Sequence, residues 1–287
     1  MFGILLIDKP EGISSHDAVN RVRRRFETRR VGHAGTLDPL ATGVLVVAVG
    51  PATRFLQYLP LEPKEYVGTI AFGACTTTLD REGEIVWQCP LPDNLNELLT
   101  ATLPRFQGLI EQVPPMFSAI KKDGKPLYEL ARMGKQVERR PRRVHVETFE
   151  ITSLRLPEAE FRVVCSGGTY VRTLANDLGK AVGCGAHLSS LKRTRVGRFL
   201  LESAVPLEEA GPADLIPLAE ALRPMTMVRL DPSQVDDARM GRSLECDGAL
   251  SNGQLAGLLS GDTAIGVARC RNGRLHPECV IPAEAFL

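Results

Sequence analysis

The amino-acid sequence predicts an α+β fold with a small β-rich module at its C-terminal end. Its 287 residues are 44% hydrophobic and 24% charged, ordinary values for a globular chain with a packed core. Strand-like and helix-like segments follow one another along residues 1–222 without the strict strand–helix alternation of a parallel α/β protein. Residues 223–287 instead show short strand-like runs between turn signals, among them Gly248 and the Asn-Gly pairs at 252–253 and 272–273. We therefore expect two domains, 1–222 and 223–287.

The N-terminal region predicts two strands with a helix between them. Residues 4–7 form a short apolar run. Ser14 then stands three residues before Asp17, the spacing of a capping box at the start of a helix. Residues 44–49 are continuously aliphatic, which is typical of a buried strand and far too short to cross a bilayer. The apolar residues of the helix repeat at i, i+3 and i+7, so they share one face: Val19, Val22 and Phe26.

The middle of the chain predicts further strands and helices. Strand-like runs occupy residues 66–72 and 161–165, and residues 94–102 are the start of a helix. The acidic, proline-containing residues 202–224 predict a linker between the two domains. Another helix is marked by apolar residues at i, i+4 and i+8: Leu174, Leu178 and Val182.

Two basic segments follow from the charge pattern, although the net charge is only +1. Residues 113–143 are rich in proline and glycine around one short helix, 127–133, as in a functional insertion. Residues 121–143 hold nine Lys and Arg against three acids, and residues 192–198, read as a second loop, hold four against none. Such segments suit a polyanion, since each neutralised phosphate releases counterions; charge alone leaves a merely solvated surface as the alternative. The candidate phosphate contacts are Lys121, Lys122, Arg139, Arg140, Arg142, Arg143, Lys192 and Arg193.

Several classes of site are excluded by what the sequence lacks. Seven cysteines are scattered without any C-x-x-C pair, which favours reduced thiols in a cytoplasmic protein over a disulfide framework or a zinc site. No H-E-x-x-H, G-x-x-x-x-G-K-[ST] or helix-opening G-x-G-x-x-G is present, so we expect no catalytic metal, nucleoside triphosphate or dinucleotide. The apolar start lacks a basic n-region, so we expect no secretory signal and no membrane association.

The most informative residue is Asp38, which lies in a glycine-rich loop, residues 32–43. Pro39 disfavours helical dihedral angles at Asp38, and the three flanking glycines allow the backbone to approach a ligand closely. A carboxylate held in this way could be a nucleophile, a general base or a metal ligand. An Asp-Pro turn with a purely structural role is the alternative that spacing leaves open.

Longer runs of sequence carry a resemblance to a known family. The chain resembles the tRNA pseudouridine synthase B (TruB) family in LLIDKPEGISSHDAV and RRVGHAGTLDPLATGVLVVAVGPATR. The likeness continues in order through KEYVGTIAFG, TTTLDREG, PPMFSAIKKDGKPLYELAR, CSGGTYVRTLANDLG and HLSSLKRTRVGRF. Together these runs cover most of residues 3–199, which makes a purely structural Asp38 untenable.

The resemblance implies a fold, a reaction and a substrate. The fold would be that of a pseudouridine synthase, with a mixed central sheet, a basic insertion near 113–143 and a divergent PUA-like domain at 223–287. The reaction would convert uridine 55 in the T loop of tRNA to pseudouridine, with Asp38 as the catalytic carboxylate and no cofactor. The partner would be the T arm of tRNA, and the chain would act as a monomer without an obligatory protein partner. Whether Asp38 attacks the base, attacks the ribose or assists an elimination stays open.

The resemblance also implies roles for individual residues. Tyr66 matches the ring that stacks on the flipped uracil and is a candidate general base. Arg172 matches the arginine that pairs with the catalytic aspartate, and a nearby cation would keep that carboxylate ionised. Tyr170 borders the same pocket and is expected to share a strand face with Arg172. Leu191 matches an apolar pocket wall.

Three further positions match family motifs with supporting roles. His33 matches a histidine that fills space vacated by rearranged T-loop nucleotides. Asp80 stands where the family has an acid near the site, and Lys9 belongs to a motif beneath the active-site loop. Gly167 and Thr77 depart from the common family pattern, where a lysine or serine and an aspartate stand.

Two rival functions remain compatible with parts of the sequence. An RNA-binding or chaperone protein without chemistry would also use the basic insertion and the PUA-like tail, but it would not need Asp38, Tyr66, Tyr170 and Arg172 together. A synthase that works through a guide complex is the second rival, and the short chain without long basic tails speaks against it.

Overall fold

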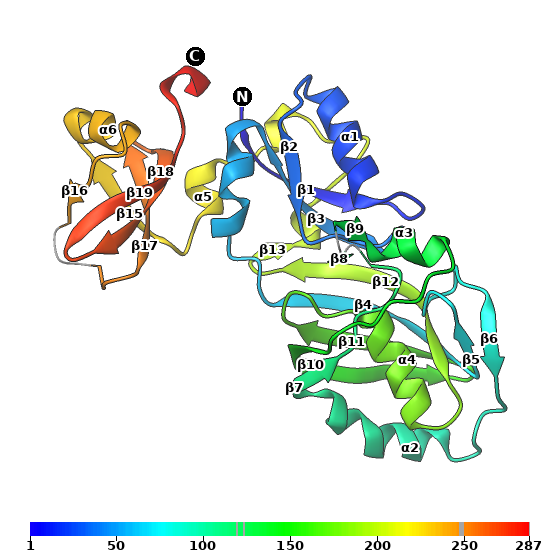
Figure 1. The fold of residues 1–287 in the computed structure, drawn as a ribbon. Coiled ribbons are helices and arrows are strands. Elements are labelled where there is room, and N and C mark those ends of the chain that lie inside the picture. Colours follow the sequence, from blue (N-terminus) through cyan, green and yellow to red (C-terminus); the bar gives the residue numbers. More distant parts are fainter. Residues whose placement is uncertain (119, 123, 247–249, 287) are drawn as a thin grey trace. The chain divides into compact units, whose positions relative to one another are not determined.

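The structure is a computed structural model that describes residues 1–118, 120–122, 124–246 and 250–286 (Figure 1). The chain divides into two compact units, each built from separate stretches of sequence. The first comprises Met1–Asp38, Val44–Leu61 and Phe199–Leu287, and the second comprises Pro39–Gly43 and Glu62–Arg198. The mixture of helices with largely antiparallel sheets confirms the α+β fold class.

The N-terminal part of the first unit is built around a short sheet and one helix. Its strands pair in the order β14–β1–β3, with β2 antiparallel to β3 and β14 parallel to β1. The strands are β1 (Gly3–Lys9), β2 (Val31–Ala34), β3 (Thr42–Val49) and β14 (Val205–Pro206). The other elements are α1 (Ser15–Arg25), η1 (Gly50–Tyr58), β13 (Phe199–Leu200), η3 (Leu201–Ser203), η4 (Pro212–Asp214) and α5 (Leu218–Ala221).

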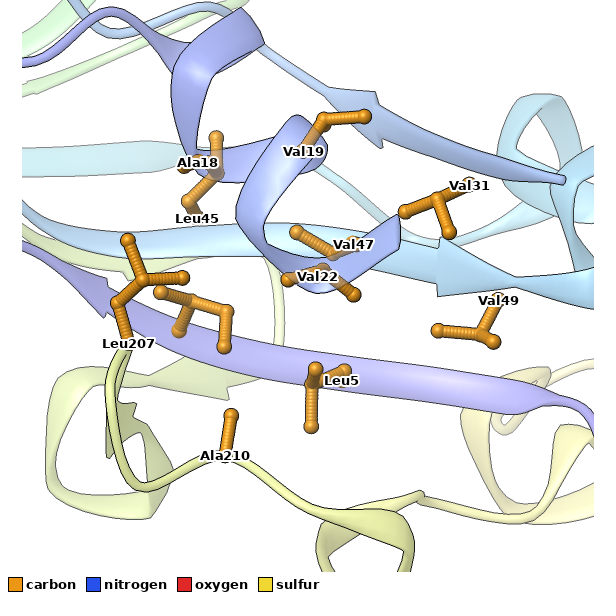
Figure 2. Close-up of a cluster of buried hydrophobic side chains, with 11 residues drawn as sticks. Leu5, Ala18, Val19, Val22, Val31, Leu45, Val47, Val49, Leu207 and Ala210 are labelled. Atoms are coloured by element: carbon orange, nitrogen blue, oxygen red, sulfur yellow. The ribbon is translucent and has the colours of Figure 1, made fainter. Parts of the chain in front are cut away.

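Helix α1 forms as the sequence predicts. Ser14 is its N-cap and accepts from the backbone N–H of Asp17, whose carboxylate accepts from the Ser14 N–H in return. The apolar face of the helix packs on β1, β2 and β3 (Figure 2). Each buried Val or Leu stabilises such a cluster by about 1.5–3 kcal/mol. The cluster contains Leu5, Ile7, Ala18, Val19, Val22, Val31, Leu45, Val47, Val49, Leu207 and Ala210.

The linker predicted at residues 202–224 is wrong. Leu207 and Ala210 from this stretch are buried in the cluster beneath α1. Ile216 exchanges two backbone hydrogen bonds with Ile4 at the start of the chain. The segment is therefore part of the packed core, because its apolar side chains join the same cluster as those of α1 and β1.

The β-rich C-terminal module is confirmed as a five-stranded sheet with its own core. The turn at residues 272–273 has positive φ at both Asn272 (51°) and Gly273 (74°), the geometry of a tight hairpin turn. The turn signal at Gly248 lies outside the described residues, and the domain boundary after Leu222 stays a prediction. In sheet order the strands are β15 (Thr226–Leu230), β17 (Leu255–Ser260), β18 (Thr263–Arg271), β19 (Arg274–Val280) and β16 (Leu244–Glu245), accompanied by α6 (Pro232–Arg239) and η5 (Ala283–Phe286).

The second unit is organised around a twisted antiparallel sheet. The order is β12–β4–β11–β10–β7, and the first two residues of β3 pair in parallel with β12. Residues 192–196, predicted to belong to a basic loop, lie in β12, and residues 142–143 of the insertion begin β10. The strands are β12 (Ala186–Val196), β4 (Lys64–Phe72), β11 (Glu158–Cys165), β10 (Arg142–Arg155) and β7 (Gly108–Gln112).

Helix α4 (Val171–Ala181) packs against β12 at very close range. A Cβ built on Gly179 would lie 2.2 Å from the backbone N of Ala186, so only glycine allows this approach. Two small hairpins complete the unit, β5 with β6 and β8 with β9. These strands and the remaining helices are β5 (Ala74–Thr76), β6 (Ile85–Gln88), β8 (Lys121–Lys122), β9 (Lys125–Pro126), α2 (Leu95–Thr102), η2 (Leu103–Phe106) and α3 (Leu127–Arg132).

Candidate functional site

Asp38 follows a residue that α1 holds by two hydrogen bonds. The Ser15 hydroxyl, buried in the first turn of α1, donates to the Leu37 carbonyl at 3.0 Å and accepts from the Leu37 N–H at 2.8 Å. Asp38 itself is half-buried, next to the fully buried Leu37 side chain. Sequence reasoning missed this contact of Ser15 with the residue before Asp38, although Ser15 stands in the family-like run ISSHD.

Lys9 orders the turn that leads into α1. Its side chain is completely buried, and its ammonium donates to the carbonyls of Pro10 and Ile13 at 2.8 Å each. This turn ends at the Ser14 cap, immediately before Ser15. The structural role proposed for Lys9 thus has a physical basis: it fixes the start of the helix from which Ser15 holds Leu37.

The other end of the Asp38 loop enters the sheet of the second unit. Thr42 and Gly43 pair with Lys192 and Arg193 of β12. Gly43 has φ +100°, and a Cβ there would lie 2.2 Å from the Arg193 carbonyl oxygen, so no other residue fits. His33, expected in the loop, lies in β2 opposite Val47. The loop is therefore shorter than predicted, with both its ends in regular strands.

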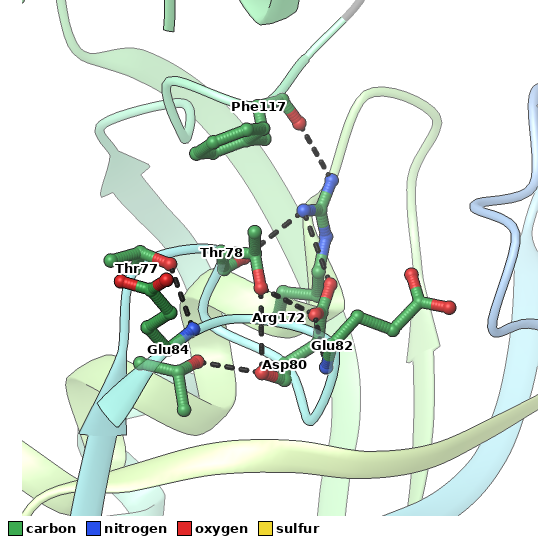
Figure 3. A network of polar contacts seen from close by, with 8 residues as sticks. Thr77, Thr78, Asp80, Glu82, Glu84, Phe117 and Arg172 are labelled. Carbon is green, nitrogen blue, oxygen red and sulfur yellow. Dashed lines mark hydrogen bonds and ion pairs between the residues drawn. The ribbon is translucent and has the colours of Figure 1, made fainter. Parts of the chain in front are cut away.

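Arg172 and Asp80 form a nearly buried ion pair (Figure 3). Their side chains are 5% and 4% exposed, and Nη1 of Arg172 lies 3.4 Å from Oδ2 of Asp80. The guanidinium also donates to the Thr78 carbonyl at 3.1 Å and to the Phe117 carbonyl at 2.9 Å. The Asp80 carboxylate accepts from the Thr78 hydroxyl at 2.5 Å and from the Glu82 N–H at 3.1 Å. Such bonds are what a buried ion pair requires.

Tyr170 and Arg172 do not share a strand face, contrary to the prediction. Tyr170 is the N-cap of α4 and Arg172 lies in its first turn. The buried amide of Gln112, at the end of β7, grips the Tyr170 backbone: Oε1 accepts from its N–H at 2.8 Å, and Nε2 donates to its carbonyl at 3.1 Å. The prediction failed because a single T-Y-V-R motif carries no period. Gln112 was missed because its partner is distant in the sequence, so no pattern near it marks the contact.

Tyr66 and Leu191 lie on one face of the central sheet. Leu191 of β12 stands opposite Gly68 of β4, and side chains alternate along a strand, so Leu191 and Tyr66 point the same way. Both are 7% exposed. Arg193 stands opposite Tyr66 and is fully buried.

Two charged groups near these strands have shifted pKa values. Burial, followed by the positive charge of Arg193, lowers the pKa of the Lys64 ammonium at the start of β4. Burial raises the pKa of Asp177 in α4, although Asn176 donates to its carboxylate at 2.8 Å.

The basic residues proposed for phosphate contact fall into two groups. The exposed ones lie around the insertion and in β12: Lys121, Arg140, Arg142, Arg143 and Lys192. A cavity of about 380 Å³ is lined by Lys121, Arg139, Arg140 and Arg142. Arg139 is half-buried and donates to the Pro114 carbonyl at 3.0 Å. Arg193 is buried, so its assignment as a phosphate contact is wrong; the side chain of Lys122 lies outside the described part.

No metal or membrane site emerges from the part of the chain that the structure describes. Within residues 1–118, 120–122, 124–246 and 250–286, no three His, Cys, Asp or Glu side chains gather as metal ligands. No helix among them combines the length and apolarity needed to span a bilayer. The expected absence of a cofactor stays a prediction.

Comparison with known proteins decides the family. Residues 23–171 match the TruB family pseudouridylate synthase N-terminal domain. Residues 172–227 match the tRNA pseudouridylate synthase B C-terminal domain. The chain belongs to the TruB family. It is therefore a pseudouridine synthase, and the resemblance drawn from the sequence motifs is confirmed.

Relatives of this TruB-family chain match it over most of its length. It is 46% identical over 300 residues to "tRNA pseudouridine synthase B" of Cupriavidus metallidurans, covering 97% of this chain and 94% of the relative. It is 47% identical over 218 residues to the protein of the same name from Opitutus terrae, covering 76% and 89%. Among solved structures, a Cbf5–Nop10–Gar1 complex matches with a TM-score of 0.72 at 25% identity, covering 99% of this chain and 87% of the other.

Proposed function

We propose that this chain converts uridine 55 in the T loop of tRNA to pseudouridine, with Asp38 as its catalytic carboxylate. The observation that carries the proposal is the loop G-H-A-G-T-L-D-P-L-A-T-G, whose Asp38 follows the anchored Leu37 in a TruB-family chain. Full-length relatives named tRNA pseudouridine synthase B support tRNA as the substrate.

The reaction is an isomerisation that balances without a cofactor. The N1–C1′ bond of the uridine breaks, the uracil turns, and a C5–C1′ bond forms; C5 loses a proton and N1 gains one. Attack by the carboxylate on the ribose or base, and assistance to an elimination, both need an ionised Asp38. A partly buried aspartate stays ionised when a cation is close, which is the role proposed for Arg172.

Arg172 is suited to this role because its own position is fixed. Asp80 and the carbonyls of Thr78 and Phe117 hold its guanidinium. Arg172 would thus present a fixed positive charge, so that little reorganisation accompanies the chemistry. The assignment of Asp80 as a supporting acid agrees with this contact.

The remaining proposed residues would receive the base and the RNA. Extracting a base from its stack costs about a few kcal/mol. Stacking on Tyr66 can offset this, since base–aromatic stacking contributes about 1–3 kcal/mol. Leu191, on the same face of the sheet, would form the apolar wall, and Tyr170 would border the pocket. His33 would contact the rearranged T loop, and the exposed basic residues would contact phosphates.

The decisive experiment uses the purified chain alone with an unmodified tRNA transcript labelled with tritium at C5 of uridine. Tritium release, and mapping of the product to position 55, are expected without any other protein, guide RNA or added metal. Binding without tritium release would instead favour an RNA chaperone, and release only after adding a guide RNA complex would favour the second rival. Loss of pseudouridine 55 from cells lacking the protein is the matching test in vivo.

A further inference from the structure

The hairpin of β5 and β6 exposes an unusual apolar surface in the second unit. All four residues of β6 are exposed, and Ile85, Val86 and Trp87 are 56%, 63% and 46% exposed. Beside them is a cavity of about 420 Å³, within the range of sites that hold a small organic group. None of the residues assigned to uridine 55 lines it. The proposed function therefore leaves this cavity unused.

Trp87 is held as a fixed platform at the mouth of this cavity. A Cβ built on Gly185 would lie 2.7 Å from Cζ3 of the Trp87 ring, so the indole rests directly on the Gly185 backbone. That backbone is itself fixed, because Gly185 accepts from the Gly73 N–H at 3.0 Å and donates to the Gly179 carbonyl at 2.9 Å. A flat aromatic ring held this way is suited to stacking, since little freedom is lost on binding.

The ring and the charge beside the cavity favour a nucleotide. Lys180 is the one charged residue among the described residues that line it, and it is exposed. Thr76 and Asn176 also line it, but both are buried, and their side chains already donate to the Asp80 carbonyl at 2.6 Å and to the Asp177 carboxylate at 2.8 Å. An exposed aromatic face beside an exposed cation matches the base and phosphate of one unpaired nucleotide. An apolar protein segment would use the ring alone, whereas the phosphate of a nucleotide would also use the charge of Lys180.

The cavity also lies within reach of the proposed site. Asn176 and Lys180 are one and two turns along α4 from Arg172, about 6 and 12 Å at 1.5 Å per residue. On the other side, the cavity is lined by Leu79, adjacent to the Asp80 that holds Arg172. A strand of RNA whose target uridine is at Arg172 could therefore place a nearby nucleotide here.

We propose that the cavity between the β5–β6 hairpin and the end of α4 binds one unpaired nucleotide of the substrate RNA, with its base on Trp87 and its phosphate at Lys180. This proposal rests on the proposed function, because it takes tRNA as the ligand. RNA loops are recognised through splayed bases, which makes a second base site a useful source of specificity.

The sequence offers a direct reporter, since Trp87 is the only tryptophan of the chain. Intrinsic fluorescence is followed while unmodified tRNA transcript is added to the Asp38→Asn protein, which is expected to bind tRNA without turnover. Saturable quenching and reduced accessibility to acrylamide are expected. Unchanged fluorescence at saturating RNA, with binding verified by filter retention, would overturn the proposal. Quenching that depends on protein concentration without RNA would also overturn it, in favour of docking by a second copy of the chain.

Variants separate stacking from simple apolar contact. Trp87→Leu should weaken tRNA binding about 5- to 150-fold, whereas Trp87→Phe should retain most of the affinity. Lys180→Ala should lower the slope of log K against log salt by about 0.7, and Lys180→Arg should preserve it. Equal losses for Leu and Phe, or an unchanged slope, would contradict nucleotide binding. Tritium release by the wild-type chain tests the proposed function separately. If tritium is released but the fluorescence of Trp87 does not change when RNA binds, only this inference is refuted.

Discussion

Replacing Gln112 with methionine removes the amide that grips the Tyr170 backbone while keeping a side chain of similar size. Two hydrogen bonds are lost, each worth about 1 kcal/mol net, and the Tyr170 N–H loses this acceptor at a further cost of about 1–3 kcal/mol. Since Gln112 is only 3% exposed, water cannot easily replace the amide. We expect the free energy of unfolding to fall by about 3–5 kcal/mol.

The same substitution should slow the reaction, because Tyr170 caps the helix whose first turn carries Arg172. A displacement of about 1 Å at a catalytic group can cost about 100-fold in rate. Single-turnover tritium release at saturating enzyme should therefore fall about 10- to 100-fold, with unfolding in urea measured in parallel. Gln107→Met is the matched control: it removes one bond, to the Phe149 carbonyl, from an exposed glutamine. A rate within twofold of wild type, in a destabilised Gln112→Met protein, would refute the positioning role.

Three other predictions address chemistry, RNA contact and charge. Asp38→Asn should bind tRNA normally and release no tritium; turnover above a few per cent of wild type would contradict its assignment. Asp177→Asn should raise the midpoint of thermal unfolding at pH 7. Because the pKa of Asp177 is raised, the folded carboxyl holds its proton more tightly than the unfolded one, so the stability of the wild type falls as pH rises above 3.8. The neutral asparagine avoids this loss. The gain should vanish below pH 3.8, and a gain independent of pH would exclude this cause. A variant with alanine at Arg140, Arg142 and Arg143 should lower the slope of log K for tRNA binding against log salt by about 1.4–1.8 if two of these arginines contact phosphates. An unchanged slope would place them away from the RNA. Arg139 is retained because it donates to the Pro114 carbonyl.

Local rules explain the elements that were predicted correctly. The Ser14–Asp17 capping box and the apolar period of α1 are complete within a dozen residues, so the sequence specifies them without tertiary information. The Asn-Gly turn at residues 272–273 is equally local, because it needs only two residues that tolerate positive φ. Local rules alone could not decide whether Asp38 is catalytic or belongs to a structural turn, and the family resemblance favoured the catalytic role.

Tertiary contacts explain the elements that the sequence did not predict correctly. Leu207 and Ala210 are isolated apolar residues in an acidic stretch, and only the space beneath α1 makes them core. Arg193 looks like surface charge in the sequence, yet its strand lies between β3 and β4 and buries it. Ser15 and Gln112 act on the backbone of distant residues, so no pattern near them reveals their roles.

The close contact of Gly179 with Ala186 fixes the position of α4 against β12. A Cβ on residue 179 would lie 2.2 Å from the Ala186 backbone nitrogen, so the helix would have to shift by about 1 Å or more to relieve the clash. A helix is stiff along its axis, so that displacement would reach Arg172, seven residues or about 10 Å upstream. A methyl group at residue 179, two turns away from the guanidinium of Arg172, would thus displace that positive charge from its place in the proposed site. The position of the arginine proposed to keep Asp38 ionised therefore depends on a contact at the other end of α4.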